Sequence, residues 1–290
     1  MTYPKISIVT PNYNKAQYLE QTICSVLSQN YPNMEYIIID GGSTDGSVNI
    51  IKKYASHLTY WVSEPDKGMY HAIKKGFEHA TGEIMAWLNS DDMYYPKSLF
   101  TIASVFSEYK DVQWLTGFNA NFDEQGRTVS VWPATYFSHL SFLMRNYQYV
   151  QQESTFWRRD LYDKVGGISL DYQMAGDFDL WMRFSRYEKM YIVNALIGGF
   201  RINKGQLSEN LDKYTKEAED IIAKEPISKD EQKEVRFIQK IRPRVLSILQ
   251  RFKVLNWQSI DERFMKRYLD EEKSHRFYYD LDKKRFLLLK

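Results

Sequence analysis

The sequence predicts an α/β fold with a mostly parallel central sheet and helices on its faces. Short β-branched runs alternate with amphipathic segments through the first hundred residues, and this alternation is typical of βαβ units. Hydrophobic residues make up 43% of the 290-residue chain, which is enough for a sizeable core and too many for a disordered chain. We therefore expect one large domain, or one domain with an appendage.

The expected elements of the first half follow one another in a regular order. β-branched runs predict strands at 6–10, 36–39, 58–63 and 83–88, the first ending at Pro11. Apolar residues at helical spacing predict helices after Asn14, which we expect as a cap, after Gly46, and from Met69. In parallel sheets of this kind, ligands bind beyond the carboxyl ends of the strands. Polar residues at those ends are therefore the first candidates for a site.

The pattern loosens from about residue 112. A hairpin is expected around Glu124–Gly126, a helix over 176–186 and a strand over 191–200, whereas the chain beyond residue 211 reads as helical and charged, with breaks at Pro226 and Pro243. The divisions that we expect are a body at 1–210, with halves of about 1–110 and 111–210, and a helical basic extension at 211–290.

The formal net charge of +2 conceals an asymmetry. Residues 229–290 hold 17 Lys+Arg and 10 Asp+Glu, which leaves 22 basic and 27 acidic residues in the remainder. An acidic body without a recognised binding module argues against nucleic acid as a partner. No apolar run reaches the roughly 18 residues of a membrane span, and the first residues lack the apolar segment of a signal peptide. The single Cys24 excludes a disulfide framework, so we expect a cytoplasmic protein.

Adjacent carboxylates follow the fourth expected strand, in the run Asn89-Ser90-Asp91-Asp92. Neighbouring acids at a strand end repel one another unless a cation lies between them, and a hard divalent ion is the usual one. The alternative, which is commoner for an isolated Asp-Asp pair, is a solvated turn before Pro96.

The loop from Asp40 to Gly46 contains three glycines and two small hydroxyl residues, so its backbone can approach a nucleotide closely. It is neither a P-loop nor a dinucleotide fingerprint, and it reads equally well as a tight turn with a helix cap. Tyr13 is placed to stack on a base, although a lone tyrosine is more often just half-buried.

Asp177 opens the helix expected at 176–186, where the helix dipole favours an ionised carboxylate. Such a group is a candidate general base, and the alternative is a simple cap. The five histidines show no His-x-x-x-His spacing, and no Gly-x-Ser-x-Gly elbow is present. The histidines therefore indicate neither a metal site nor a Ser-His-Asp hydrolase.

Taken in order, five motifs resemble those of the family 2 inverting glycosyltransferases with the GT-A fold. They are Ile8-Val9-Thr10-Pro11-Asn12-Tyr13-Asn14, Asp40 to Gly46, Ser63-Glu64-Pro65-Asp66-Lys67-Gly68, Leu88-Asn89-Ser90-Asp91-Asp92, and Asp177-Phe178-Asp179-Leu180-Trp181. The resemblance covers roughly residues 4 to 210. The segment 63–76 is most similar to a bacterial subgroup that builds polysaccharides, often O-antigen or capsule.

The resemblance implies a GT-A catalytic body whose first half binds the nucleotide and whose second half binds the acceptor. Asp91 matches the last acid of the family's Asp-x-Asp motif and would hold Mg²⁺ or Mn²⁺, while Asp177 matches the catalytic base. The donor and nucleotide contacts that it implies are Thr10, Pro11, Tyr13, Asp40, Ser43, Asp66, Lys67, Asn89, Ser90 and Asp92.

The resemblance implies acceptor or diphosphate contacts less sharply. For the two tryptophans among them, an ordinary place in the aromatic core is an equally good interpretation. These residues are Gln152, Glu153, Trp157, Trp181, Arg201 and Gln206. Two positions depart from the family pattern: Asn89 replaces the first acid of Asp-x-Asp, and Gly176 replaces a frequent Glu before the base. Neither departure removes Asp91 or Asp177, so we expect activity.

The expected partners are a nucleotide-sugar donor, with a UDP-sugar favoured, and a saccharide or polyprenyl-diphosphate-linked acceptor. A nucleotidyltransferase that makes a sugar nucleotide and a non-catalytic nucleotide-sugar-binding relative stay open as alternatives. The basic residues 229–290 are consistent with docking on the inner face of the cell membrane, or with packing on the body or on a partner chain. Homo-oligomerisation is also left open.

Overall fold

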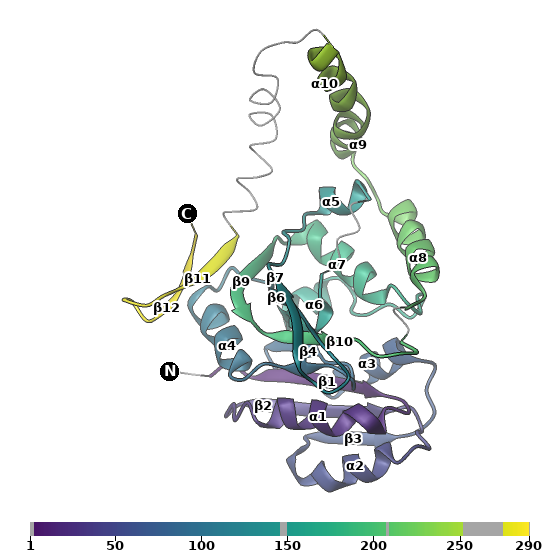
Figure 1. Cartoon of the computed structure of the whole chain (residues 1–290), viewed down its shortest axis with the longest axis vertical. Coiled ribbons are helices and arrows are strands. Elements are labelled where there is room, and N and C mark those ends of the chain that lie inside the picture. The colour runs from purple at the N-terminus through teal and green to yellow at the C-terminus, as the bar shows by residue number, and fades with distance from the viewer. Residues whose placement is uncertain (1–2, 146–149, 207–208, 252–274, 290) are drawn as a thin grey trace.

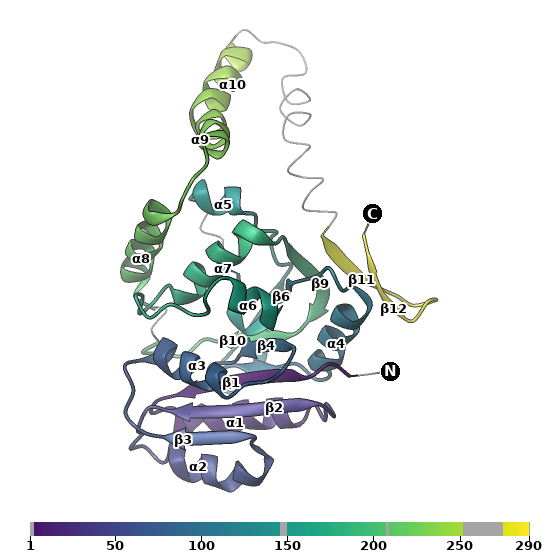
Figure 2. The same cartoon turned by 180° about the vertical axis from the view of Figure 1, so that it is seen from behind.

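The computed structural model describes residues 3–145, 150–206, 209–251 and 275–289. Its strands join in one mixed sheet with the order β12-β11-β9-β6-β8-β4-β1-β2-β3, and three shorter pairings, of β7, β5 and β10, lie off this path. The first helices cover both faces of this sheet (Figures 1 and 2). The α/β fold class that the sequence predicts is confirmed.

The strands fall into a parallel group at one side of the sheet and a mixed group at the other. They are β1 (Ile6–Asn12), β2 (Met34–Asp40), β3 (Tyr60–Ser63), β4 (Ile84–Trp87), β5 (Met93–Tyr94), β6 (Trp114–Phe122), β7 (Thr128–Trp132), β8 (Thr155–Arg158), β9 (Met190–Leu196), β10 (Gly198–Arg201), β11 (Arg276–Asp280) and β12 (Arg285–Leu288). Strands β1 to β4 are mutually parallel, and their register sets Asn12 opposite Asp40 and Asp40 opposite Ser63. The polar residues at three strand ends therefore meet at one edge, as the sequence predicts.

The helices bury two apolar cores, one on each face of the sheet. They are α1 (Ala16–Leu27), α2 (Ser47–Tyr54), α3 (Met69–Glu78), α4 (Ser98–Glu108), α5 (His139–Leu143), α6 (Arg159–Lys164), α7 (Gly176–Tyr187), α8 (Leu211–Lys224), α9 (Lys229–Arg236) and α10 (Arg242–Arg251). Leu19, Ile51 and Leu99 belong to the core under α1, α2 and α4. Ile73, Trp181 and Ile221 belong to the core under α3, α7 and α8.

The C-terminal extension has two different parts. Helices α9 and α10 project away from the sheet in both views (Figures 1 and 2). The hairpin of β11 and β12, by contrast, joins the sheet through parallel pairing of β11 with β9. The extension is thus not helical throughout, and its last strands belong to the same sheet as the body. The aromatic run Phe277-Tyr278-Tyr279 was the available sign of a strand, because aromatic residues are enriched in strands.

Four local predictions need correction. Strand β1 runs through Pro11, because β4 pairs with β1 only as far as Val9 and a proline without an N–H is tolerated beyond that point. Lys15, rather than Asn14, precedes helix α1, and Asn14 has a positive φ of 51°. The strand expected at 191–200 is divided into β9 and β10. Pro243 does not interrupt the helix: it is the second residue of α10, where a proline is tolerated, and the irregularity lies before it in the π-helical turn Phe237–Ile241.

Candidate active site

Asp40 ties together the ends of three strands. Its carboxylate accepts hydrogen bonds from Asn12 Nδ2 at 2.6 Å, from Ser63 Oγ at 2.6 Å, and from the backbone N–H and hydroxyl of Ser43 at 2.9 and 2.6 Å. The residue is fully buried. Burial opposes ionisation, but the hydrogen bonds from Ser43, Ser63 and Asn12 outweigh it and lower the pKa of Asp40. In the structure, Asp40 and Ser43 therefore bind each other and help to hold the ends of β1, β2 and β3 together.

The other residues expected on the nucleotide side lie at different depths. Thr10 is fully buried, and its hydroxyl lies 3.2 Å from that of Tyr36. Pro11 is also buried within β1, whereas the Tyr13 ring is 63% exposed just beyond it. Asp66 accepts a hydrogen bond from the backbone of Gly68. Tyr13, together with the partly exposed Asp66 and exposed Lys67, is the part of this set that a ligand can reach.

Asp91 and Asp92 differ sharply although they are neighbours. Asp91 Oδ2 lies 2.8 Å from Lys15 Nζ and accepts a hydrogen bond from Asn203 Nδ2, while its side chain keeps 14% exposure. Asp92 is buried, and its carboxylate accepts the backbone N–H of Arg201 and the side-chain amide of Asn89. Burial and the negative charges of Glu153 and Asp91 raise the pKa of Asp92 well above its usual range. Asp91 is therefore the acid of this pair that a ligand can meet.

Arg201 and Gln206 bind main-chain atoms of this chain, which corrects the expectation that their side chains contact an acceptor or a diphosphate. Arg201 is completely buried, and its guanidinium donates to the backbone carbonyls of Asp91, Asp123 and Glu124. Gln206 donates to the Arg201 carbonyl. Because Arg201 binds main-chain atoms of the acidic turn and of the β6–β7 turn, it fixes where Asp91 stands.

Glu153 occupies the buried interior behind this edge. The short 3-10 helix Gln152–Ser154 packs on the end of β4, where Gln152 donates to the Trp87 carbonyl and accepts from Asn89. Glu153 is 3% exposed, and its Oε1 has no hydrogen-bond partner within the described part of the chain. Burial, followed by the charges of Asp177 and Asp91, raises the pKa of Glu153 to about 8. Ser90, also buried, contributes its carbonyl to Thr22.

Asp177 stands at the first turn of α7, where the sequence predicts it, and Tyr70 of α3 contacts it. The Tyr70 hydroxyl lies 3.3 Å from Asp177 Oδ1 and accepts the backbone N–H of Asp177 at 3.2 Å. Burial raises the pKa of Asp177 to about 6, against the opposing hydrogen bonds from Phe178 and Tyr70. Tyr70 was missed by the sequence reading, because a tyrosine in an amphipathic helix carries no signal that it meets a residue 107 positions away.

Trp157 and Trp181 lie in the core and do not offer a ring face to a sugar, which corrects the expectation that they stack on one. Trp181 is stacked between Trp87 and Trp114, with ring centroids 5.8 and 5.7 Å away. Trp157 is fully buried against the same cluster. The alternative of an ordinary aromatic core is therefore correct for both.

A divalent metal, which the motif implies, finds suitable oxygen donors at this edge. Among the described residues, no three His, Cys, Asp or Glu side chains are grouped to hold an ion by themselves. Magnesium is commonly held by one or two carboxylates together with substrate phosphates. Asp91 supplies one such carboxylate, and the neighbouring Asn89 has a buried Oδ1 for which no partner is found in the described ranges. The donor set fits a hard cation that is shared with a bound diphosphate.

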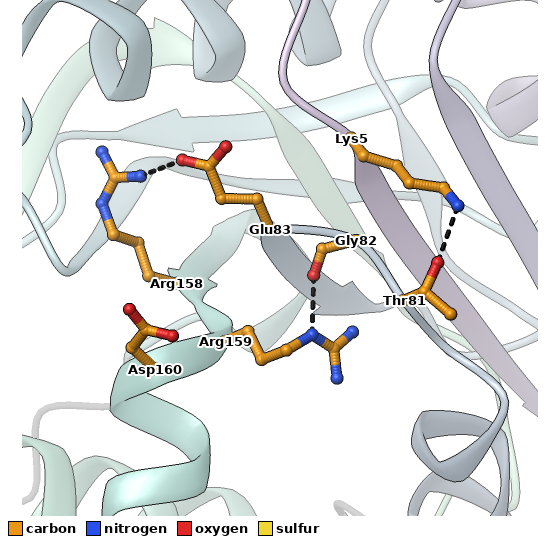
Figure 3. Close-up of a pocket in the computed structure, with 7 residues that line it drawn as sticks. All are labelled: Lys5, Thr81, Gly82, Glu83, Arg158, Arg159 and Asp160. Atoms are coloured by element: carbon orange, nitrogen blue, oxygen red, sulfur yellow. Dashed lines mark hydrogen bonds and ion pairs between the residues drawn. The ribbon is translucent and has the colours of Figure 1, made fainter.

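A charged pocket lies at the opposite edge of the sheet and is separate from this site. Its volume is about 410 Å³, and Lys5, Gly82, Arg158 and Arg159 line it with three others. Figure 3 shows that these groups bind one another: Lys5 donates to Thr81, Arg158 pairs with Glu83, and Arg159 donates to the Gly82 carbonyl. These interactions connect the amino ends of β1 and β4 with the end of β8.

Comparison with known proteins identifies relatives of this chain. The glycosyl transferase family 2 model matches residues 7–166, which is more than half of the chain. An uncharacterized glycosyltransferase of Mycobacterium tuberculosis is 32% identical over 182 residues, covering 62% of this chain and 68% of that protein. Another from Rickettsia typhi is 26% identical over 209 residues, covering 70% of this chain and 65% of that protein. About a third of each relative therefore lies outside the match.

Solved structures share the fold. Residues 1–349 of TarS from S. aureus, in complex with UDP-GlcNAc, align with a TM-score of 0.64 at 16% identity, over 81% of this chain and 73% of that one. The mannosyltransferase PcManGT from Pyrobaculum calidifontis, in complex with GDP-Man and Mn²⁺, aligns with a TM-score of 0.59 at 14% identity, over 93% of this chain and 81% of that one. The fold is the GT-A fold, and the chain belongs to glycosyl transferase family 2.

Proposed function

We propose that this glycosyltransferase moves a sugar from a nucleotide-sugar donor to a saccharide or lipid-linked saccharide, with inversion at the anomeric carbon. One observation carries the proposal: Asp91 and Asp177 both lie near enough to the buried Glu153 for their charges to raise its pKa. The two acids that the motifs single out are therefore near the same buried residue. An inverting transfer needs one acid on the side of the leaving diphosphate and another on the side of the attacking hydroxyl, because these groups lie on opposite sides of the anomeric carbon.

The proposed chemistry assigns one step to each group. The acceptor hydroxyl attacks the anomeric carbon, and the bond from that carbon to the diphosphate oxygen breaks, releasing the nucleoside diphosphate. Asp177 accepts the hydroxyl proton late in this step. Asp91 would hold Mg²⁺ or Mn²⁺, which when bound neutralises charge on the diphosphate. Glu153, whose Oε1 is buried without a partner in the described residues, would accept a hydrogen bond from a hydroxyl group of the transferred sugar.

A UDP-sugar is the donor that we propose, with support from the UDP-GlcNAc complex of TarS. A role in surface polysaccharide synthesis, as in O-antigen or capsule, draws support from TuaG of Bacillus subtilis, for which a part in teichuronic acid biosynthesis has been suggested. TuaG is 40% identical over 96 residues, covering 31% of this chain and 37% of TuaG. A nucleotidyltransferase is disfavoured because such enzymes need a basic, glycine-rich loop after β1, where this chain has Thr10 to Asn14.

A donor screen tests this proposal. Thermal unfolding is measured with UDP, GDP and their sugars, each with and without Mn²⁺, and we expect the largest rise in Tm with a uridine nucleotide and Mn²⁺. Release of nucleoside diphosphate from the stabilising sugar nucleotide then separates an enzyme from a non-catalytic relative. Stabilisation without any turnover would favour the non-catalytic alternative, and no stabilisation by any nucleotide would contradict the proposal.

We also propose that α10 docks on anionic lipid, which suits a polyprenyl-linked acceptor. Its side chains Val245 and Ile248 are 45% and 55% exposed, and Arg244 and Arg251 lie on the same exposed helix. None of the helices within the described residues is long and apolar enough to span a membrane. In flotation with phosphatidylglycerol vesicles, we expect Val245→Asp with Ile248→Asp to lose binding. The exposed strand pair Val129→Asp with Val131→Asp is the control, and equal flotation of all three proteins would contradict docking by α10.

A further inference from the structure

We propose that Tyr70 and Glu217 are positioning residues that hold the start of helix α7 and tune Asp177 as the general base. The inference rests on the proposed function, since it concerns the same carboxylate. Tyr70 comes from α3 in the first half of the chain, and Glu217 comes from α8 in the extension. Two segments remote from each other in the sequence would thus control one proton acceptor.

The buried Tyr70 hydroxyl contacts both Asp177 and the segment just before α7, so its single hydrogen is shared between two acceptors. The ring is 4% exposed, and the hydroxyl donates to the Met174 carbonyl at 3.0 Å besides lying 3.3 Å from Asp177 Oδ1. The same oxygen accepts the Asp177 N–H, one of the groups that a helix start leaves without an intrahelical partner. The contact therefore fixes both the main chain and the side chain of Asp177.

Gly176 explains how this ring fits beside the helix. A Cβ built on Gly176 would lie 2.8 Å from Cε2 and Cζ of Tyr70, closer than real Cβ contacts allow. Any side chain at this position would displace the ring. The departure from the family pattern at Gly176 is thus matched to Tyr70.

Glu217 anchors the segment that leads into α7. Its carboxylate accepts three successive backbone N–H groups, those of Gln173 at 3.1 Å, Met174 at 2.8 Å and Ala175 at 2.9 Å. An anion at a helix N-terminus is favoured by the helix dipole and by these unpaired donors. Glu217 belongs to α8, more than twenty residues beyond the end of α7, so a side chain from a later helix positions the start of the base helix.

The two residues act on Asp177 in opposite directions. The Tyr70 hydrogen bond stabilises the carboxylate and lowers the pKa of Asp177, whereas the negative charge of Glu217 raises it. Other groups that act on Asp177 are its own backbone N–H and that of Phe178, which lower its pKa, and the nearby Glu153 from the 3-10 helix. Variants at Tyr70 and Glu217 should therefore shift the titration of one group with opposite signs.

The first arm of the test compares Tyr70→Phe with Tyr162→Phe, in the full chain. Tyr162 is a matched control, because its buried hydroxyl also binds a backbone N–H, that of Ile168, but does not touch Asp177. We expect Tyr70→Phe to move the acidic limb of the kcat–pH profile about one pH unit higher. Tyr162→Phe should leave the limb in place.

The second arm compares Glu217→Gln with Glu219→Gln on the same helix. Glutamine keeps an oxygen that can accept the N–H groups but removes the charge, so we expect the limb to move roughly half a pH unit lower or less. Glu219 pairs with Arg145 on the surface and should give no shift. Glu217→Ala removes the acceptor as well as the charge. We expect its kcat to be lower than that of Glu217→Gln, with little change in the donor KM.

A titration independent of turnover separates this inference from the proposed function. The carboxyl carbons of aspartate are labelled with ¹³C, and the Asp177 signal is identified as the one absent from Asp177→Asn. Opposite shifts of this titration in Tyr70→Phe and Glu217→Gln support the inference even if no transfer is found, in which case only the proposed function fails. An unmoved Asp177 titration in both variants would overturn the inference.

Discussion

Asp40 at the end of β2 and Asp177 at the start of α7 are both carboxylates, yet their pKa values move in opposite directions. Asp40 is fully buried and receives donors from three strand ends, so its pKa is lowered. Asp177 receives fewer donors, so the loss of water around its carboxylate prevails and raises its pKa to about 6. The number of donors, rather than depth alone, decides which buried acid stays a structural anion and which becomes able to exchange a proton near neutral pH.

Unpaired oxygens are buried in both parts of the body. Around β1 to β3, Asp40 receives donors from Asn12, Ser43 and Ser63, but Oδ1 of Asn12 has no partner in the described residues. Around β4 and β8, Oδ1 of Asn89 and Oε1 of Glu153 are likewise buried without partners in the described residues. Unpaired buried oxygens are costly, so we expect a bound donor to supply the missing hydrogen bonds.

The sharpest test of the contrast between Asp40 and Asp177 is Asp177→Asn. We expect kcat to fall on the order of 10²–10⁴-fold, because the amide cannot accept the proton, while donor affinity stays nearly unchanged. The wild-type kcat should also fall as the pH drops below about 6, where Asp177 becomes protonated. Steady-state kinetics and donor titration calorimetry measure both quantities. A near-wild-type kcat would remove Asp177 from the role of base.

Asp40→Asn should affect stability instead. The new amide cannot accept all the donors that converge on Asp40, so we expect a loss of about 2–4 kcal/mol in the free energy of unfolding. Since the folded-state pKa is lowered, the stabilisation by Asp40 is present above its unfolded pKa of about 3.9 and is lost as the pH falls through the folded value. Urea unfolding gives the free energy of unfolding of Asp40→Asn, and Asp111→Asn, at an exposed position, is the control variant. Equal stability of the two variants would refute the structural role.

Asp91→Asn should fall between these two cases, with weaker ligand binding and an intact fold. We expect the affinity for a nucleoside diphosphate in the presence of Mn²⁺ to drop at least about tenfold, or roughly 1.4 kcal/mol, since one carboxylate ligand is lost. Glu83→Gln, at the opposite edge, is the control. Calorimetric titration with and without Mn²⁺ gives the result, and an unchanged metal-dependent affinity would count against Asp91 as the ligand.

The smallest effect is expected at His139, where α5 meets the helices of the extension. Its ring nitrogens lie 3.0 Å from Glu225 and 2.8 Å from Glu231. Burial disfavours the charged ring, but the hydrogen bonds to both glutamates outweigh it and raise the pKa of His139. The stabilisation is therefore full below the unfolded pKa of about 6.5 and is lost as the pH rises through the folded value.

The corresponding measurement is the difference in thermal stability between wild type and His139→Gln. We expect an advantage of about 1 kcal/mol for the wild type at pH 6 that shrinks toward pH 9. A difference that is constant across this pH range would show that the histidine charge does not matter.

Particular residues show how far the sequence could be read. The strand ends at Asp40 and Ser63 were predictable, because the apolar runs stop there and parallel strands share an edge. The end of β1 at Asn12 was not, because Pro11 was expected to end that strand. The burial of Arg201, Trp157 and Trp181 was not, because arginine and tryptophan serve equally well at a ligand or in a core. The β11–β12 hairpin was missed since its pairing with β9 joins residues more than eighty positions apart.

By itself, the sequence determined the fold class, the family and the positions of Asp91 and Asp177. These follow from local periodicity and short motifs, which depend on neighbouring residues only. The tertiary structure alone decided which acids are kept ionised by hydrogen-bond donors and which are not. It also placed Tyr70 and Glu217 beside the start of α7. Hydrogen bonding and burial depend on segments that meet only after folding, so they leave no trace in local pattern.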